Sequence, residues 1–524
     1  MPGTFTRKWD YRFLWPTFLL FLAGFVWAYY KAFALGLTAS FALGPEGPSL
    51  WAAQTMAIGG NIYPLGTLTH APWVVNIYPP IYPAVVGWIF KISGPVLPLM
   101  RVVTMVSFVA CLGVAWRIFS LSGMSRMAQM ISFATFASFT TVWAHSFKGR
   151  PDMLALAFLL MSIQQYLVLS HKQRNASIMR LPRLIIIATL VCLACLTKQN
   201  SLVVVPAIAG ALIIGRRWRL SLVFTSIATT LIVAAEMLTN RYSGGGFFDH
   251  VSFSAQAPFI WSALFQHLSW MGADLWLFTL TPVFIGGIFY KIFSDYLNNA
   301  SGDRIEPHRH YLSAVVLAVF LFIIGSMQAI YAMGLECAST DDILISLFAC
   351  AWIVGLVSEY FSRKYLIALF AFYLVGLYVM LSVASSTALG VSRNGLAREQ
   401  LYNAPIGSFG NGGRCLSEDP ALPIMYDLTP EFVDLRTFFA VWKRDPHYFR
   451  ARLGEIKGKI VARQYRALIL NSRDGCLIEP YRYWSEELIK SVKGRYRPVV
   501  ELFEEDGYKD FYMPVQPSEH ETHP

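Results

Sequence analysis

The chain has 524 residues, of which 55% are hydrophobic, 15% aromatic and only 14% charged. A soluble globular protein carries about 25% charged residues, so this composition excludes disorder, argues against a soluble enzyme and indicates a polytopic membrane protein. The formal net charge of +11 does not point to nucleic acid, because the basic residues lie in short clusters between apolar runs. Seven cysteines in a chain of this length do not make a disulfide framework.

Apolar runs of membrane-spanning character follow one another along most of the chain. A helix needs about 20 mostly apolar residues to cross a bilayer. A further run within 73–97 contains several prolines and is too short to cross, so we expect it to form a helix in the outer membrane interface. The sequence thus predicts about eleven transmembrane helices, at 13–33, 99–118, 127–145, 152–170, 183–197, 201–216, 220–238, 273–292, 311–331, 342–360 and 364–388.

Basic residues are distributed unevenly between the loops. Leaving out the C-terminal segment, seventeen Lys and Arg residues fall in one alternate set of loops and seven in the other. The positive-inside rule places the richer set, which includes the N-terminus, in the cytoplasm. With eleven spans the C-terminus is then extracytoplasmic. The longer polar segments of the membrane domain 1–389, namely the loops 34–98 and 239–272, share this outer face.

The composition changes after residue 389, where charged residues become frequent and no apolar span remains. Two β-rich pieces, at 466–470 and 497–503, flank a helical pattern at 483–496. We therefore expect residues 390–516 to form a small extracytoplasmic α/β domain. The last residues, 517–524, predict a disordered tail.

The first outer loop contains a single acidic residue. Glu46 is the only carboxylate between Asp10 and Asp152, and a helical pattern that ends at two glycines follows it. Glu46 is either a solvated loop residue at the start of this helix or a general base at the membrane surface.

Two further polar positions lie at the outer ends of predicted spans. In Lys148-Gly-Arg-Pro-Asp152, the carboxylate either caps a helix or projects into a polar cavity. Lys198 either belongs to a plain hairpin turn or binds a lipid phosphate, with Arg150 and Arg241 near the same level.

Other polar residues give weaker signals. Glu336, Asp341 and Asp342 flank the outer ends of two spans and are expected to be solvated helix caps, with contact to an acceptor or an ion as the alternative. The outer histidines His70, His145, His250 and His267 lack the spacing of metal ligands, so no metal site is predicted, although a divalent metal is not excluded. Cys415 and Cys476 both lie in the extracytoplasmic segment, where a disulfide between them is permitted.

The order of these motifs resembles the GT-C class of membrane glycosyltransferases, in particular the protein O-mannosyltransferase and aminoarabinose-transferase superfamily. In that family an acidic motif opens the first outer loop, a helix then ends in Gly-x-x-Tyr, and a Tyr-Pro-Pro-x-Tyr motif precedes an interfacial helix. An Asp and a Thr-Lys dipeptide follow at the outer ends of later spans. The resemblance covers about residues 10–240 and is carried by Glu46, Gly60-Asn-Ile-Tyr63, Tyr78-Pro-Pro-Ile-Tyr82, Asp152 and Thr197-Lys198.

This resemblance implies a transferase that moves a sugar from a polyprenyl-phosphate donor to a lipid, glycan or protein acceptor, at the outer face of a bacterial inner membrane. It implies inversion at the anomeric centre and no cofactor or metal. By the same resemblance the catalytic carboxylates are Glu46 and Asp152, the donor phosphate is bound by Lys198, Arg150 and Arg241, and the substrate contacts Tyr63, Tyr78, Tyr82 and Gln199. The family often has an acidic pair in the loop, whereas here Pro45 precedes Glu46.

Two other functions remain open from the sequence. A transporter or flippase of lipid-linked sugars would need ionisable residues within spans and internal repeats, whereas almost all charges here lie at span ends. A polysaccharide polymerase or ligase would use a large outer loop with Arg and His, and the loop 239–272 contains Arg241, His250 and His267.

Overall fold

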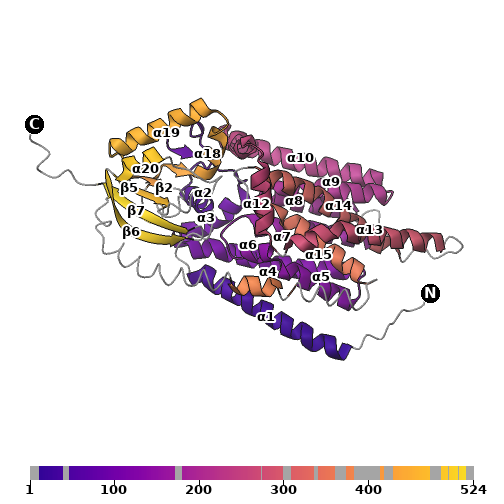
Figure 1. The fold of residues 1–524 in the computed structure, drawn as a ribbon. Coiled ribbons are helices and arrows are strands. Elements are labelled where there is room, and N and C mark those ends of the chain that lie inside the picture. Colours follow the sequence, from indigo (N-terminus) through magenta and orange to yellow (C-terminus); the bar gives the residue numbers. More distant parts are fainter. Residues whose placement is uncertain are drawn as a thin grey trace, which may run out of the picture.

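The structure is a computed structural model in which a bundle of helices is followed by a small mixed sheet at one end (Figure 1). The beginning of the first helix and the sheet lie at opposite ends of the bundle. The structure describes residues 11–38, 46–171, 180–272, 274–298, 308–335, 340–359, 373, 375–382, 413–417, 429–471, 486–493, 495–504 and 507–514.

Five of the described helices are long and apolar enough to cross a membrane, namely α4(Leu97–Leu121), α7(Asp152–His171), α10(Trp218–Tyr242), α14(His308–Met333) and the helix that η3(Thr340–Ile343) and α15(Leu344–Ser358) form together. Helices α12(Trp261–Trp270) and α13(Asp274–Asn298) make a sixth candidate, but they meet at 99°. The predicted number of about eleven spans is therefore not established, and most of the predicted span 364–388 lies outside the described residues. The helices of the bundle are α1(Tyr11–Thr38), α4(Leu97–Leu121), α5(Arg126–Ser138), α6(Thr140–His145), α7(Asp152–His171), α8(Arg180–Cys195), η1(Gln199–Val203), α9(Val204–Ile214), α10(Trp218–Tyr242), α11(Gly246–Phe253), η2(Ser254–Gln256), α12(Trp261–Trp270), α13(Asp274–Asn298), α14(His308–Met333), η3(Thr340–Ile343) and α15(Leu344–Ser358).

The predicted span 127–145 is not one continuous helix. It divides into α5 and α6 at Phe139, whose backbone is extended. The first N–H groups of α6, on Thr140 and Thr141, donate to the carboxylate of Asp274 at 2.9 and 2.8 Å. Backbone donors at a helix start have no partner within their own helix, so the buried Asp274 satisfies them and stabilises the break. The sequence does not reveal this partner, which comes from α13.

The first outer loop folds into two short helices, α2(Gly47–Ala57) and α3(Ile81–Ser93), with the short strand β1(Trp73–Val74) between them. Helix α3 has 13 residues and is about 20 Å long, which is too short for a hydrocarbon core of about 30 Å. One of its faces packs on the protein, while Val85, Trp88 and Ile92 are exposed. This is the amphipathic arrangement of the predicted interfacial helix.

The described part of the C-terminal segment forms a five-stranded sheet in the order β3-β2-β5-β7-β6. Strand β2 is parallel to β3 and β5, and β7 is antiparallel to β5 and β6. The predicted strands 466–470 and 497–503 correspond to β5 and β6, and the predicted helix 483–496 contains α20. The division between 389 and 390 lies outside the described residues and stays a prediction. The elements are β2(Arg414–Ser417), β3(Thr429–Pro430), β4(Phe432–Val433), α18(Leu435–Trp442), α19(Pro446–Val461), β5(Ala467–Asn471), α20(Glu486–Lys493), β6(Tyr496–Glu504) and β7(Gly507–Pro514).

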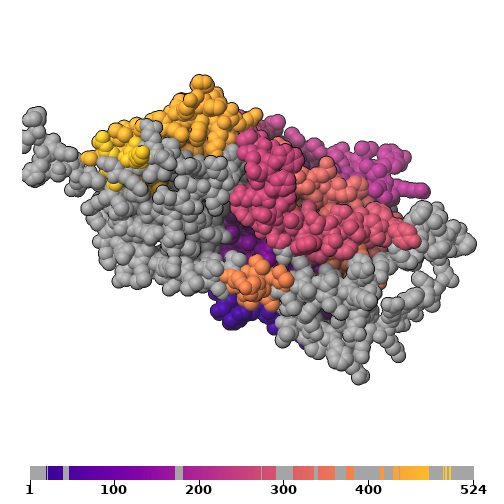
Figure 2. Space-filling model, in the orientation of Figure 1, coloured from indigo at the N-terminus to yellow at the C-terminus, as the bar shows by residue number. Residues whose placement is uncertain are grey.

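The first outer loop supplies part of the core of this segment. Strand β1 pairs in parallel with β4, so that Trp73 lies beside Phe432 in the ladder. The Trp73 ring stacks on Phe432 with centroids 4.6 Å apart and meets the edge of Trp442 at 5.4 Å. Phe253 of α11 joins the same apolar cluster. The segment is thus fixed to the loop by buried aromatic surface, and it lies against one end of the bundle (Figure 1 and Figure 2).

A hydrogen bond at the edge of this contact allows the docking of the C-terminal segment on the first outer loop to be tested with a small perturbation. Arg452 of α19 donates to the carbonyl of Thr69 at 2.7 Å. We expect Arg452→Ala to weaken the docking of the segment by about 1 kcal/mol, because a hydrogen bond to a charged group is lost at an exposed site. Limited proteolysis should then cleave the segment faster than in the wild type. Arg450→Ala is the matched control, since within the described ranges Arg450 bonds to the carbonyl of Pro446 in its own helix. Equal cleavage in both variants would contradict the prediction.

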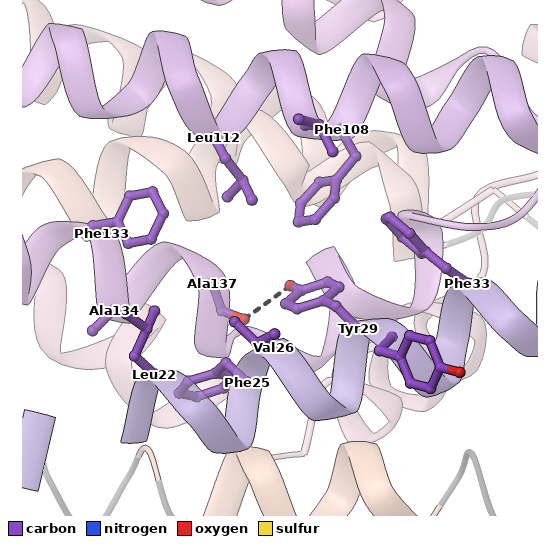
Figure 3. A pocket seen from close by; sticks show the side chains of 12 residues that line it. Leu22, Phe25, Val26, Tyr29, Phe33, Phe108, Leu112, Phe133, Ala134 and Ala137 are labelled. Carbon is purple, nitrogen blue, oxygen red and sulfur yellow. Dashed lines mark hydrogen bonds between the residues drawn. The ribbon is translucent and has the colours of Figure 1, made fainter. Parts of the chain in front are cut away.

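An apolar cavity of about 380 Å³ lies between α1, α4 and α5 (Figure 3). Its walls are apolar and aromatic, and the hydroxyl of Tyr29 donates to the carbonyl of Ala137 at 2.9 Å. None of the described residues that line it carries a charge. The cavity lies near the middle of α4 and offers, among those residues, no carboxylate, histidine or lysine, so the polar residues elsewhere define the candidate site.

Candidate functional site

Lys198 lies at the centre of a buried ionic cluster. It occupies the turn between α8 and η1, and its ammonium group contacts three carboxylates. Nζ donates to Oδ1 of Asp152 at 2.7 Å, bonds to Oδ2 of Asp341 and lies 3.2 Å from Oδ1 of Asp342. Asp152 is the first residue of α7, and the other two belong to η3. The cluster thus joins three helices at the end of the bundle that the first outer loop covers.

Arg150 is the second cation of the cluster. Its Nη2 donates to the hydroxyl of Tyr78 at 2.7 Å and to Oδ2 of Asp341 at 3.1 Å, and its Nε lies 3.4 Å from Oδ2 of Asp152. His145 adds a ring nitrogen 3.9 Å from that Asp152 oxygen. Arg150 therefore connects the carboxylates to the Tyr-Pro-Pro-x-Tyr motif of the loop.

The charges of this cluster are almost removed from solvent. The side chains of Asp152, Arg150, Asp341 and Lys198 are 1, 3, 3 and 9% exposed, and that of Asp342 is 12% exposed. Burial alone would lower the pKa of Lys198, but the carboxylates, Asp152 first, outweigh it and hold this pKa well above its usual value. Lys198 thus remains protonated through the neutral and alkaline range. With two cations and three carboxylates, the ionised cluster has a net charge of −1.

Glu46 forms a separate buried ion pair beside this cluster. It immediately precedes α2, as the sequence predicts, but its side chain does not cap that helix. Instead Arg101 of α4 donates to it, with Nη2 2.6 Å from Oε2 and Nε 2.9 Å from Oε1. The backbone N–H of Gly149 also donates to Oε1. Both side chains are fully buried, so the interpretation of Glu46 as a solvated loop residue is wrong.

The Glu46–Arg101 pair is joined to the cluster through the backbone. Gly149, which binds Glu46, directly precedes Arg150. Arg101 also donates to the carbonyl of Gly36 at 2.9 Å and so ties in the end of α1. A Cβ on Gly149 would meet Met100 and Oε1 of Glu46, so this close approach needs a glycine. The pair therefore fixes the segment that presents Arg150.

The tyrosines and Gln199 of the predicted substrate site divide into two groups. Tyr78 contacts the cluster directly, and the hydroxyl of Tyr63 donates to the carbonyl of Tyr78 at 2.8 Å. Gln199 donates to the carbonyl of Ile77 at 3.2 Å, while its side-chain oxygen is buried with no hydrogen-bond partner in the described part of the chain. Tyr82 points elsewhere, because its hydroxyl donates to the carbonyl of Met100 at 3.2 Å.

Other predicted residues lie apart from the cluster. Arg241 is exposed in the last turn of α10, and no recorded contact among the described residues joins it to Lys198 or Arg150. His250 and His267 are buried, bonded to Pro64 and Met333 carbonyls respectively. Within the described ranges, no three His, Cys, Asp or Glu side chains are arranged to hold a metal ion.

The predicted disulfide is not tested. Cys415 is buried on β2 and forms no disulfide with any described cysteine. Cys476 lies outside the described residues, as does the tail 517–524. The Cys415–Cys476 bridge therefore stays a prediction.

Sequence reasoning did not favour Asp341 and Asp342 as members of the site, and it missed Arg101. The two aspartates were expected to be solvated caps, and this is wrong for Asp341, which is buried and paired with both cations. The topology already placed the turn before residue 342 on the same face as Asp152 and Lys198, and that was the signal available. For Arg101 the sequence offers no such signal, because its partner lies in another element.

Comparison with known proteins gives similarity of fold only. No family model and no curated protein sequence matches the chain. Among solved structures, the chain is similar to the apo oligosaccharyltransferase of Archaeoglobus fulgidus, with a TM-score of 0.51 and 10% identity over 95% of this chain and 74% of that one. The AglB oligosaccharyltransferase of the same organism, in complex with an inhibitory peptide and a dolichol-phosphate, gives 0.50 and 11% over 98% and 75%.

ArnT from Cupriavidus metallidurans bound to undecaprenyl phosphate matches with a TM-score of 0.48 and 12% identity, over 97% of this chain and 99% of that one. The two archaeal structures, which are oligosaccharyltransferases of the GT-C class, share their fold with this chain. The motif order in the first half of the chain and this match over nearly its whole length agree. The chain therefore has a GT-C-like fold.

Proposed function

We propose that this protein is a membrane glycosyltransferase that moves a sugar from a polyprenyl-phosphate-linked donor to an acceptor hydroxyl. The observation that carries the proposal is the buried cluster of two cations and three carboxylates at the loop-covered end of a GT-C-like bundle. The archaeal oligosaccharyltransferase of this fold was solved with a dolichol-phosphate, which supports a lipid-phosphate donor in general. We place the cluster at the extracytoplasmic face, with the N-terminus in the cytoplasm, because of the charge bias of the loops.

In this proposal Lys198 and Arg150 bind the donor phosphate and stabilise its charge as it leaves. The donor phosphate would take the place of the Asp342 carboxylate beside the ammonium group of Lys198. This carboxylate is the most exposed of the three and lies farther from Nζ than Asp152 does. Tyr78 and Gln199 would line the path by which the donor reaches the two cations, and Tyr63 would hold Tyr78 in place through its hydrogen bond. Arg241 would contact the donor lipid farther from the phosphate. Tyr82 would support the first outer loop.

Asp152 is our proposed general base. Its Oδ1 accepts from Lys198, while Oδ2 has an ion-pair contact with Nε of Arg150 at 3.4 Å but accepts no hydrogen bond from the described residues. We propose that Oδ2 takes the proton of the acceptor hydroxyl. Glu46 is the alternative base from the family resemblance, but both its oxygens already accept hydrogen bonds. We propose instead that Glu46 positions Gly149 and Arg150. In-line attack by the acceptor would invert the anomeric centre without a metal ion.

The direct test is sugar transfer by the purified protein with a panel of polyprenyl-phosphate sugars and candidate lipid, glycan and protein acceptors. We expect release of polyprenyl phosphate in step with glycosylated product, and the same rate with and without a chelator. Transfer of the donor between the two leaflets of a proteoliposome membrane, without any release of polyprenyl phosphate, would contradict the proposal and favour a flippase.

Donor binding gives a second check on the same site. We expect Lys198→Ala to weaken binding of a non-hydrolysable donor analogue, by about 10-fold or more, because a charge-assisted contact worth about 1.5–3 kcal/mol is lost. Lys91→Ala is the matched control, since Lys91 is an exposed lysine at the end of α3. Equal affinities in the two variants would remove Lys198 from the donor site.

A further inference from the structure

The apolar cavity between α1, α4 and α5 opens on the outside of the bundle. Side chains of α1 face those of α4 and α5 across it (Figure 3). Phe25 and Phe108 line its inner wall and are buried. Val26, Tyr30 and Val109 also line it and are 62, 60 and 57% exposed. The cavity can therefore be entered from the side, without passage through the bundle.

The depth of the cavity determines what can enter it. On α4 its lining residues are Phe108, Val109 and Leu112, near the middle of a 25-residue helix that is long and apolar enough to cross a membrane. The middle of such a helix lies in the hydrocarbon core of the bilayer, which is about 30 Å thick. Apolar cavities do not hold water but take up apolar ligands. The occupant available at this depth is a hydrocarbon chain of a membrane lipid.

The size of the cavity agrees with a ligand site. Protein interiors contain few voids larger than a water molecule, whereas this cavity has a volume of about 380 Å³. Small-molecule sites usually have about 300–1,000 Å³ and mostly apolar walls. The one polar group that Figure 3 shows on its wall, the hydroxyl of Tyr29, already donates to the carbonyl of Ala137. The walls are thus suited to an apolar chain.

A cation lies beside the mouth of the cavity. The ring of Tyr30, at the mouth, stacks on Trp27 with centroids 5.7 Å apart, and Nζ of Lys31 lies 4.8 Å from the centroid of the Trp27 ring. All three side chains are exposed. Within the described part of the chain, no carboxylate forms an ion pair with Lys31. Its charge is therefore available to an anion outside the protein.

The position of Lys31 along α1 fits a lipid headgroup. Lys31 lies seven residues before Thr38, the end of the helix, which corresponds to about 10 Å. A lysine near the end of a spanning helix extends its ammonium group towards the headgroups. On the predicted topology these belong to the outer leaflet. From Lys31 the α1 lining of the cavity continues back to Leu22, deeper in the membrane.

We infer that α1, α4 and α5 form a binding site for one anionic phospholipid of the outer leaflet, with an acyl chain in the cavity and the phosphate at Lys31. The cavity has its own cation, and none of its lining residues belongs to the elements that hold Lys198 and Asp152. The site is therefore separate from the proposed donor site. It does not depend on the proposed function.

Photolabelling of the full-length protein in detergent tests this inference. The probe is a phosphatidylglycerol that carries a diazirine on one acyl chain, and mass spectrometry of the irradiated protein locates the label. We expect the label on residues of α1, α4 and α5 that line the cavity, with saturation at one lipid per chain.

Two variants fill the cavity from different walls. Val109→Trp places an indole at the mouth, and Ala134→Phe places a ring in the α5 wall. Each should lower labelling of the cavity by at least fivefold at a probe concentration that half-saturates the wild type. Val106→Trp is the matched control, because Val106 is 64% exposed on the same helix and does not line the cavity. It should leave labelling unchanged.

The phosphate contact is tested separately at Lys31. We expect Lys31→Ala to raise the probe concentration for half-saturation by about fivefold, since one cation near a membrane surface contributes about 1 kcal/mol towards an anionic lipid. Lys31→Arg keeps the charge and should bind as the wild type does. Equal half-saturation in Lys31→Ala and the wild type would overturn the assignment of the headgroup.

Competition distinguishes the phospholipid from the proposed donor. Unlabelled phosphatidylglycerol should displace the probe, whereas polyprenyl phosphate at the same concentration should not. Displacement by polyprenyl phosphate would assign the cavity to the donor chain and overturn the inference. Unchanged labelling in both Val109→Trp and Ala134→Phe would also overturn it, as would an equal loss in Val106→Trp. None of these measurements requires sugar transfer, so the failure of the proposed function would leave the result intact.

Discussion

Asp152→Asn is expected to lower the rate constant for sugar transfer by about 10²–10⁴-fold, the loss that follows removal of a general base. Asparagine has the size of aspartate and keeps an oxygen that can accept from Lys198, so the cluster should stay assembled. The net charge of the cluster rises from −1 to 0, which favours an anionic donor. The KM for the donor should therefore stay the same or fall, while kcat falls by the factor given above.

This separation of kcat from KM distinguishes a base from a residue that only supports the fold. A merely structural role for Asp152 would lower the amount of folded protein and leave kcat per folded molecule nearly unchanged. Glu46→Gln is the comparison variant, because it removes the other candidate base. If Glu46→Gln shows the larger loss of kcat per folded molecule, and Asp152→Asn retains nearly full turnover, then the base is Glu46.

The sequence predicts which end of the bundle holds the site, for a simple physical reason. Apolar runs and the bias of basic residues together assign each polar turn to one face of the membrane. They place Asp152 and Lys198 on the same face, and the structure brings their side chains to 2.7 Å. The structure also has a short helix, α3, where the length of the apolar run and its prolines argue against a span, and its location in the membrane interface stays a prediction.

Pairing and burial could not be predicted in the same way. Glu46 is isolated in the sequence and reads as a loop residue, yet Arg101 of α4 packs against it and both are buried. The parallel pairing of Trp73 with Phe432 joins the first loop to the C-terminal segment. Each of these contacts joins elements that the sequence separates widely, and residue periodicity carries no information about which distant elements meet.

The bend between α12 and α13 was missed for a related reason. The apolar run 273–292 correctly indicates much of α13, but nothing in the pattern shows that α12 meets it at 99°. Each side of the bend has a partner from another element: His267 of α12 bonds to the carbonyl of Met333, and Asp274 of α13 accepts from the first N–H groups of α6. Partners of this kind lie in other elements, and the pattern of residues along one segment does not show them.

Arg101→Met is expected to lower the free energy of unfolding by about 3–5 kcal/mol, because it leaves the carboxylate of Glu46 buried without its cation. The double variant Glu46→Gln/Arg101→Met removes both charges, and we expect it to recover most of that loss, since a neutral pair of similar volume carries no uncompensated charge. Denaturant unfolding in one detergent measures both. Arg450→Met, on the exposed face of α19, should change stability by no more than about 0.5 kcal/mol.

The same double variant decides what Glu46 does. If Glu46 acts through Gly149 and Arg150, the refolded double variant should keep a stable site and lose less than the roughly 10²-fold expected for a missing base. Its KM for the donor should rise more than its kcat falls, because the segment that presents Arg150 is held less firmly. Full stability with turnover lost by more than that factor would show that the carboxylate of Glu46 is needed for chemistry, and the assignment of Asp152 as the sole base would then be wrong.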